Sequence, residues 1–176
     1  MSRFDPHSWC DGDQPRQRHL DLELNVDFET HALSGTARID LVEASVGPMD
    51  LDGRDLEIAS ITDQDGGDVP WSKAETDKIL GDRLRLDLPE GTRSFTITYA
   101  TAPGALALGW LEPQQTAGGE HPFMFSQCQP IHARTMVPCQ DTPRNRVTYD
   151  ARITVPSPLR AVMSAASVGE GVNGGP

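Results

Sequence analysis

Two side-chain amides separated by a single residue are the most informative chemical groups in this chain of 176 residues. Gln127 and Gln129 flank Cys128 within residues 109–143, a stretch through which neither a helical nor a strand period is sustained. An amide offers a carbonyl acceptor and an NH2 donor, and residues i and i+2 of an extended segment project to the same side. The pair is therefore suited to gripping a peptide backbone or an α-amine, unless both amides only satisfy the backbone of their own loop.

Nucleophilic and metal chemistry have weaker support in the residue spacing. Cys128 and His132 could mimic a catalytic Cys–His pair, but a buried cysteine that packs as a small apolar residue is the commoner case. No two histidines are spaced to share a helix face or adjacent strand positions, and neither H-E-x-x-H nor C-x-x-C occurs. Outward carboxylates such as Asp21 and Glu23 are most simply a solvated face. We therefore expect no catalytic residue and no metal ligand in this segment.

The charge balance limits the class of partner. Lys and Arg number 15 against 26 Asp and Glu, which gives a formal net charge of −11, and so acidic a surface repels phosphate backbones and anionic lipids. Three cysteines cannot all pair within one chain, so a reducing compartment is the simpler assumption. No apolar run approaches the roughly 20 residues that span a bilayer. The start of the chain lacks the basic and apolar regions of a signal peptide. These features predict a cytoplasmic protein that binds neither nucleic acid nor membrane.

Alternation of apolar and polar residues predicts strands along most of the chain. In residues 19–28 every second side chain is apolar and most of the others are acidic, which is typical of a half-buried strand. A turn at 30–35 and renewed alternation at 37–41 predict a hairpin. Further strands are expected at 49–51, 56–61, 83–88, 94–99, 146–155 and, as a shorter candidate, 159–164. Without helical spacing, this pattern indicates an all-β sandwich or open twisted sheet, followed by a Gly-rich mobile loop at 167–176.

Several motifs resemble the N-terminal domain of the M1 zinc aminopeptidases, in particular the leukotriene A(4) hydrolase branch of that family. The most specific is FMFSQCQPIHARTMVPCQDTP at 123–143, and HLDLELNVDFETHALSGTA, LDGRDLEI and VTYDARITVPSPLRAVMSA extend the similarity over about residues 19–165. The resemblance implies a saddle-shaped, mostly antiparallel β domain that packs against a catalytic domain and forms one wall of the substrate cleft. Residues 1–176 would then be a single N-terminal domain, truncated at its C-terminal end and lacking the catalytic zinc domain.

The same resemblance assigns a role to the two amides. Most of the family has a glutamate where Gln129 stands, and this glutamate helps to anchor the free α-amino group of the peptide. The leukotriene A(4) hydrolase branch has glutamine there, so Gln129, with Gln127 beside it, is expected to contact the substrate. Residues 138–143 resemble the family's Pro-Cys-x-Asp-Glu-Pro stretch, with Thr142 in place of the glutamate, and are expected to lock the loop.

Other parts of the family's apparatus do not occur in the sequence. The G-x-M-E-N loop, the H-E-x-x-H helix, the third zinc-binding glutamate and the transition-state tyrosine all lack a counterpart. Zinc is thus expected in the full-length parent and not in this segment, which would be inactive alone. Its expected partners are its own catalytic domain and the N-terminus of a peptide substrate, and epoxide hydrolysis is left open as a side activity.

A second hypothesis, from a different class, is a free-standing β-sandwich module that binds a protein or a sugar. Such a module predicts aromatic side chains displayed on one face, because aromatic anchors dominate many binding surfaces. Only 6% of the residues are aromatic, and Trp9, Trp71 and Trp110 are scattered along the chain. The sequence therefore favours the aminopeptidase interpretation.

Overall fold

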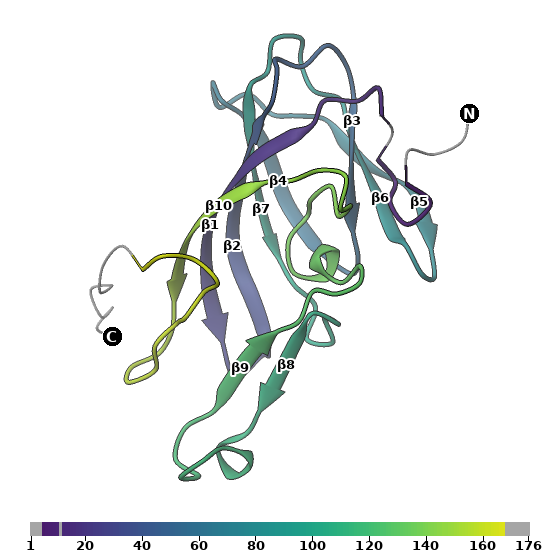
Figure 1. Cartoon of the computed structure of the whole chain (residues 1–176). Coiled ribbons are helices and arrows are strands. Elements are labelled where there is room, and N and C mark those ends of the chain that lie inside the picture. The colour runs from purple at the N-terminus through teal and green to yellow at the C-terminus, as the bar shows by residue number, and fades with distance from the viewer. Residues whose placement is uncertain (1–4, 11, 168–176) are drawn as a thin grey trace.

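Ten strands and two short 3-10 helices are the regular elements of residues 5–10 and 12–167, the part of the chain that the computed structural model describes (Figure 1). The strands form sheets of five, three and two members. The elements are β1 (Gln17–Asp27), β2 (Ala32–Leu41), β3 (Met49–Gly53), β4 (Glu57–Asp63), β5 (Trp71–Asp77), β6 (Gly81–Leu86), β7 (Ser94–Ala100), β8 (Leu108–Leu111), η1 (Pro113–Gln115), β9 (Phe123–Ser126), η2 (Ala133–Thr135) and β10 (Thr148–Thr154). The all-β fold class expected from the sequence is confirmed.

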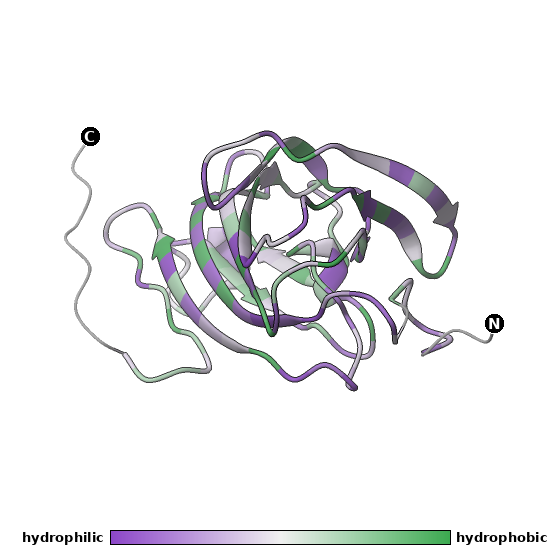
Figure 2. Ribbon diagram, turned by 90° about the horizontal axis from the view of Figure 1, so that it is seen from above, coloured by the Kyte–Doolittle hydropathy of each residue, from purple (hydrophilic) through white to green (hydrophobic). Residues whose placement is uncertain are grey.

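The five-stranded sheet, in the order β10-β1-β2-β7-β4, contains the strands with the clearest alternation. β1 pairs antiparallel with β2, and its apolar residues Leu20, Leu22, Leu24 and Val26 are buried in the core. Figure 2 shows the resulting bands of hydrophobic and hydrophilic residues along the strands. The pairing of β1 with β10 is parallel, so this edge of the sheet joins residues from opposite ends of the chain.

The three-stranded sheet, in the order β3-β6-β5, contributes to the same core. β3 is buried at all five positions, whereas six of the seven residues of β5 are exposed. The core-facing side chains of β3 and β6 are at most 1% exposed: Met49, Leu51, Leu84 and Leu86. An isolated bridge between Asp52 of β3 and Cys139 connects this sheet to the irregular segment that follows β9.

The predicted strands agree with the observed ones except in three places. The sequence does not predict β5, because WSKAETD lacks an apolar face and lies at the edge of its sheet. It does not predict the β8–β9 hairpin either, because neither four-residue strand is long enough to show a period. The prediction of a short strand at 159–164 is wrong: these residues form none, and Val162 is 91% exposed. Apart from Ser167, the expected mobile tail at 167–176 lies outside the described residues.

Within the described ranges, none of the helices has the length and apolar character of a membrane span.

Candidate functional site

The β8–β9 hairpin carries the two amides at the point where its second strand returns to the body of the domain. The strands pair antiparallel between Leu108–Leu111 and Phe123–Ser126, and the hairpin extends away from the larger sheets at the lower end of Figure 1. The backbone N–H of Gln127 donates a 2.8 Å hydrogen bond to the carbonyl oxygen of Ala107, which continues the ladder one residue beyond β9. Strand pairing therefore fixes the start of residues 126–130, which we call the twin-amide turn.

The two amides of the twin-amide turn have different environments, although both residues are exposed. Gln127 Oε1 accepts a 2.9 Å hydrogen bond from the backbone N–H of Gln129, so the carbonyl of Gln127 satisfies the loop and its NH2 group is left as a donor. The side chain of Gln129 makes no hydrogen bond within the described part of the chain. The sequence left open whether the amides satisfy their loop or face a ligand. In the structure the side chain of Gln127 satisfies its own loop, whereas that of Gln129 does not.

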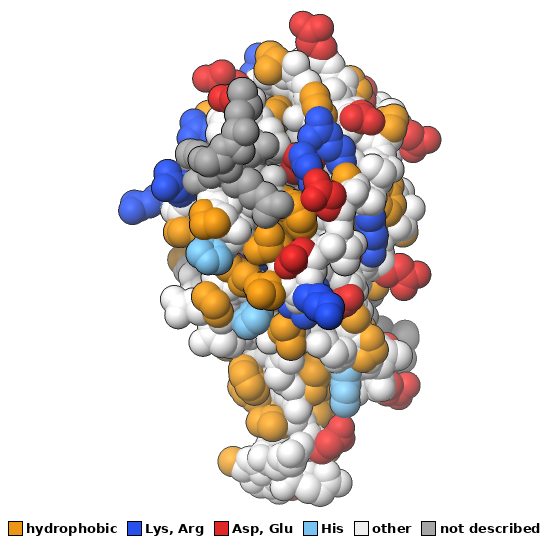
Figure 3. Space-filling view, turned by 90° about the vertical axis from the view of Figure 1, so that its right-hand side faces the viewer, with side chains coloured by type: hydrophobic (Ala, Val, Ile, Leu, Met, Phe, Trp, Pro, Cys, Tyr) orange, Lys and Arg blue, Asp and Glu red, His pale blue; other side chains and the backbone are white. Residues whose placement is uncertain are grey.

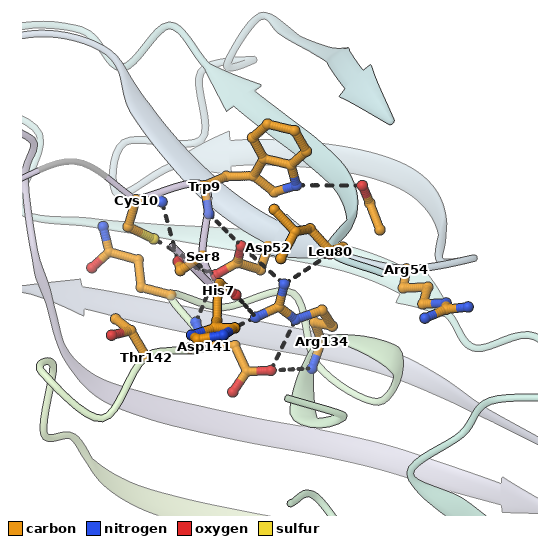
Figure 4. A network of polar contacts seen from close by, with 12 residues as sticks. His7, Ser8, Trp9, Cys10, Asp52, Arg54, Leu80, Arg134, Asp141 and Thr142 are labelled. Carbon is orange, nitrogen blue, oxygen red and sulfur yellow. Dashed lines mark hydrogen bonds and ion pairs between the residues drawn. The ribbon is translucent and has the colours of Figure 1, made fainter. Parts of the chain in front are cut away.

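The residues that follow the turn are held by a buried arginine (Figure 4). Arg134, in η2, is 0% exposed, and its guanidinium donates hydrogen bonds to the Asp141 carboxylate at 3.0 Å and to the carbonyl oxygens of Leu80 and His7 at 2.8 Å each. Its Nη1 also lies 3.4 Å from Asp52 Oδ1. A buried charge is tolerated when it is paired and hydrogen-bonded, and both conditions are met here. Residues 132–142 are called the anchor segment below.

Asp52 of β3 is the second acidic partner in this network. Its carboxylate accepts hydrogen bonds from Ser8 Oγ at 2.6 Å, from Trp9 N at 2.8 Å and from Asp141 N at 2.9 Å. Burial raises the pKa of Asp52 above its usual value, although the charge of Arg134 and these hydrogen bonds act in the opposite direction. The network ties the N-terminal segment, β3 and the anchor segment together at one point.

Gln140 provides a second buried connection between the anchor segment and the N-terminal part of the chain. Gln140 Oε1 accepts a 3.0 Å hydrogen bond from the backbone N–H of Gln17, and Gln17 Oε1 accepts a 2.9 Å bond from the backbone N–H of Gln140. Gln140 Nε2 donates to the carbonyl oxygen of Pro15 at 2.9 Å. Both glutamines are buried, so these bonds satisfy groups that water does not reach.

Thr142 completes the anchor segment by donating a 2.6 Å hydrogen bond to Asp5 Oδ2. This contact explains a hydroxyl at the position where the family pattern has a glutamate, because a carboxylate there would face Asp5. Burial tends to raise the pKa of Asp5, but the hydrogen bonds from Thr142 and His7 outweigh it, and the net pKa is lowered. The contacts of residues 138–143 agree with the expectation that this block locks the loop.

The neighbouring cysteine and histidine do not form an activated pair. His132 N–H donates a 2.8 Å hydrogen bond to the backbone carbonyl of Cys128, so the two residues are joined through the main chain. Burial, and after it the charge of Asp141, raises the pKa of the Cys128 thiol. The thiolate that nucleophilic attack or zinc ligation needs is therefore disfavoured. Neutral amides are not usual zinc ligands, and the cluster of three potential metal ligands among the described residues lies elsewhere.

An apolar surface continues from the turn along the hairpin. Leu106, Phe123 and Phe125 are 53%, 52% and 46% exposed, and the two phenylalanine rings stack with centroids 6.3 Å apart. Figure 3 shows apolar side chains extending from the middle of one face towards its narrow lower end. Exposed apolar side chains gathered in this way are typical of contact surfaces. A separate hollow of about 520 Å³ lies between residues 25–29, 121–122 and 154–159, and neither glutamine lines it.

Comparison with known proteins gives independent information about the whole chain. Residues 16–173 match the model of the peptidase M1 N-terminal domain. The chain is 36% identical over 173 residues to leukotriene A-4 hydrolase from Xenopus laevis, an alignment that covers 94% of this chain and 28% of that protein. It is 33% identical over 181 residues to leucine aminopeptidase 2 from Sclerotinia sclerotiorum, covering 97% of this chain and 30% of that protein.

Solved structures show the same relationship. Yeast LTA4 hydrolase in complex with bestatin superimposes with a TM-score of 0.86 at 29% identity, over 96% of this chain and 27% of that one. An M1 zinc metallopeptidase from Deinococcus radiodurans, bound to a Tyr-Ser-Ala substrate, has a TM-score of 0.68 at 22% identity, which shows the shared fold.

The fold and the family match together define the class of this chain as an all-β peptidase M1 N-terminal domain. The chain belongs to the peptidase M1 N-terminal domain family, and its relatives include leukotriene A-4 hydrolases and leucine aminopeptidases. The chain spans 28% of the Xenopus leukotriene A-4 hydrolase, 30% of the Sclerotinia leucine aminopeptidase 2 and 27% of the yeast LTA4 hydrolase structure. The resemblance seen in the motifs is confirmed.

Proposed function

We propose that this chain forms one wall of the substrate cleft of a zinc aminopeptidase and that Gln129 contacts the N-terminal amino group of the peptide. The observation that supports this role is an exposed amide without an internal hydrogen bond, carried on backbone that is fixed on both sides. Strand pairing holds the residues before the amide, and the buried anchor segment holds those after it. A ligand-binding group on a rigid support binds with a smaller loss of conformational entropy.

Gln127 has a positioning role in this proposal. Its carbonyl is engaged by the backbone of Gln129 at 2.9 Å, so it shapes the turn and leaves only its NH2 group for a ligand. Gln129 supplies the acceptor for the ammonium group. A neutral acceptor binds an ammonium about half as strongly as a carboxylate does, so amine binding depends more on a glutamate from the catalytic domain. A neutral wall also admits ligands without an ammonium group, such as an acidic lipid epoxide.

The chemistry at zinc is assigned to a separate catalytic domain, and the residues of this chain bind and orient the substrate. In this proposal residues 1–176 are one N-terminal domain, inactive by itself, with its own catalytic domain and a peptide N-terminus as partners. A cytoplasmic location is part of the same proposal, and the three cysteines, none of which forms a disulfide, support it.

The substitution Gln129→Glu in the complete enzyme tests the anchoring role. A carboxylate facing the ammonium should lower KM for a peptide by about three- to tenfold, because a hydrogen bond to a charged group is stronger by about 1 kcal/mol. Gln114→Glu adds the same charge at another exposed glutamine of the hairpin and should leave KM unchanged. An unchanged or raised KM for Gln129→Glu would contradict the proposed contact.

The assignment of catalysis to another domain has its own test. The 176-residue chain alone should not hydrolyse an aminoacyl-nitroanilide. Hydrolysis that persists through purification would show that the chain contains a catalytic apparatus.

One observation favours the alternative of a free-standing module that binds a protein or a sugar. Phe123 and Phe125 are displayed on the hairpin, and such a module needs exposed aromatic side chains. Membership of the M1 N-terminal domain family favours the cleft wall, in which these rings would contact the rest of the enzyme.

A further inference from the structure

Three potential metal ligands meet on the outer face of the five-stranded sheet. His19 and Asp21 lie on β1 and Asp150 lies on β10, and one ligand atom of each lies within 4.8 Å of the other two. The parallel register pairs Asp21 with Asp150 and His19 with Thr148, so these side chains share one face. The sequence alone does not reveal this cluster, because its members come from strands that are far apart in the chain. His19 of β1 and its partner Thr148 of β10, for example, are 129 residues apart.

The distances between the ligand atoms of the cluster fit coordination of one metal ion better than hydrogen bonds between the side chains. His19 Nε2 lies 3.5 Å from Asp150 Oδ2 and 3.8 Å from Asp21 Oδ1. A charge-assisted N–H···O hydrogen bond is about 2.7–2.9 Å long, so the ring nitrogen forms one with neither carboxylate. Two ligands bonded to zinc at about 2.1 Å are roughly 3.0–3.5 Å apart at tetrahedral or octahedral angles. The two histidine–carboxylate separations need closing by only a few tenths of an ångström.

The orientation of the imidazole ring also suits a metal ligand. His19 Nδ1 lies 2.7 Å from Thr148 Oγ1, and the side chain is only 20% exposed, so the ring is held in place. With the proton on Nδ1, the lone pair is on Nε2, the nitrogen that lies within 3.8 Å of both carboxylates. A hydrogen bond from the second ring nitrogen is the usual way in which a protein orients a metal-binding histidine.

The charges around the cluster leave an excess of negative charge that a divalent cation would neutralise. Asp21 stands directly opposite Asp150, and like charges in that position destabilise a pair of strands. Asp21 Oδ2 lies 3.9 Å from Arg38 Nη1, but the Arg38 guanidinium is also shared with Asp40 at 3.2 Å. Within the described ranges, the carboxylate of Asp150 has no ionic or hydrogen-bond partner other than His19.

We propose that His19, Asp21 and Asp150 bind a zinc ion that joins the edge strand β10 to β1. One imidazole and two carboxylates suit zinc, whereas magnesium prefers oxygen ligands throughout, and water would complete a tetrahedral site. The site lies on the outer face of the sheet and is independent of the proposed aminopeptidase function. It also departs from the sequence-based expectation that this segment binds no metal.

Calorimetric titration of the 176-residue chain with zinc chloride tests the site. We expect one zinc ion per chain, no heat of binding with magnesium, and a higher melting temperature in the presence of zinc. Asp150→Asn should weaken zinc binding by about tenfold or more, since it removes a direct ligand, and should abolish the zinc-dependent rise in melting temperature. His19→Gln should have the same effect.

Glu23→Gln is the matched control, because Glu23 lies on the same face of β1 and pairs with Arg152 of β10 at 3.1 Å without touching the cluster. This variant should bind zinc as the unaltered chain does. The absence of zinc binding to the unaltered chain would overturn the proposal. So would a zinc affinity in Asp150→Asn and His19→Gln that equals that of the unaltered chain. With cobalt as the probe, thiolate charge-transfer absorption would place the ion on a cysteine and would also overturn it.

Discussion

The twin-amide turn and the anchor segment are almost consecutive in the sequence but opposite in environment. Gln127 and Gln129 are exposed and share one local hydrogen bond. A few residues later, Arg134 and Gln140 are buried and bind the N-terminal segment, β3 and the loop before β6. The same irregular stretch therefore contains an exposed part, the twin-amide turn, and a buried part, the anchor segment.

This difference separates affinity for a ligand from stability of the fold. Side chains that face solvent contribute little to folding, so they are free to be selected for binding. Buried polar networks are costly when incomplete, so they hold the backbone in one conformation. Substitutions in the two regions should therefore differ in kind: the anchor segment should govern the free energy of unfolding, and the turn should govern KM.

The largest effect is expected for Arg134→Met. Removing one partner of a buried ion pair leaves Asp52 and Asp141 without their countercharge and should lower the free energy of unfolding by about 3–5 kcal/mol. Urea denaturation followed by circular dichroism measures this change. Arg54→Met is the control, because Arg54 is partly exposed and its nearest acidic group, Asp55, is 3.8 Å away. If both variants lose the same stability, the anchor segment has no special role.

Gln140→Ala should have the next largest effect. It leaves the buried backbone N–H of Gln17 and the carbonyl of Pro15 without their partners, which should lower the free energy of unfolding by about 1–3 kcal/mol. Gln114→Ala, at an exposed glutamine of the hairpin, should change it by less than about 0.5 kcal/mol. Equal effects at the two glutamines would contradict the contrast between the two regions.

Thr142→Val should change how stability depends on pH. The pKa of Asp5 is lowered in the folded state from its ordinary value of 3.8, so its contribution to stability is present above that pH and is lost as the pH falls through the lowered value. Without the Thr142 hydrogen bond the pKa of Asp5 should rise, and the acid-induced loss of stability contributed by Asp5 should shrink. Unfolding curves measured at several pH values between neutrality and acid denaturation test this. An unaltered pH dependence would show that Thr142 does not stabilise the ionised form of Asp5.

The smallest effects on stability are expected in the twin-amide turn. Gln127→Ala removes one exposed hydrogen bond and should lower the free energy of unfolding by about 0.5–1 kcal/mol, whereas Gln129→Ala should change it by less than about 0.5 kcal/mol. In the complete enzyme both variants should raise KM for a peptide, Gln129→Ala the more. A strongly destabilised Gln129→Ala would show that this side chain belongs to the fold rather than to a binding surface.

Much of the fold was predictable from the sequence because alternation is a local property. The residues of β1 and β2 show which side chains face the core without reference to any partner. The same reasoning fails for β5, which has almost no buried face, and for β8 and β9, which are too short to show a period. Strand order and direction depend on distant residues, so the parallel pairing of β10 with β1 was not accessible.

The candidate site was predictable only in part, for the same reason. The motif around Gln127 and Gln129 singled out this stretch through its resemblance to a family, but the different environments of the two amides arise from a single local hydrogen bond. Arg134 carried no signal in its own neighbourhood, since Leu80 and His7 lie far from it in the sequence. The cluster of His19, Asp21 and Asp150 escaped notice because two of its members look like ordinary surface carboxylates.

The parallel β1–β10 pair has a consequence for synthesis of the protein. Thr148 is made 129 residues after its partner His19, so one edge of β1 stays uncovered while the residues between them are made. An open strand edge is a template for pairing with other chains, and long-range pairing of this kind forms slowly. Nascent or proteolysed forms that end before β10 should therefore self-associate through β1, because the later strand β10 covers this edge of the earlier strand.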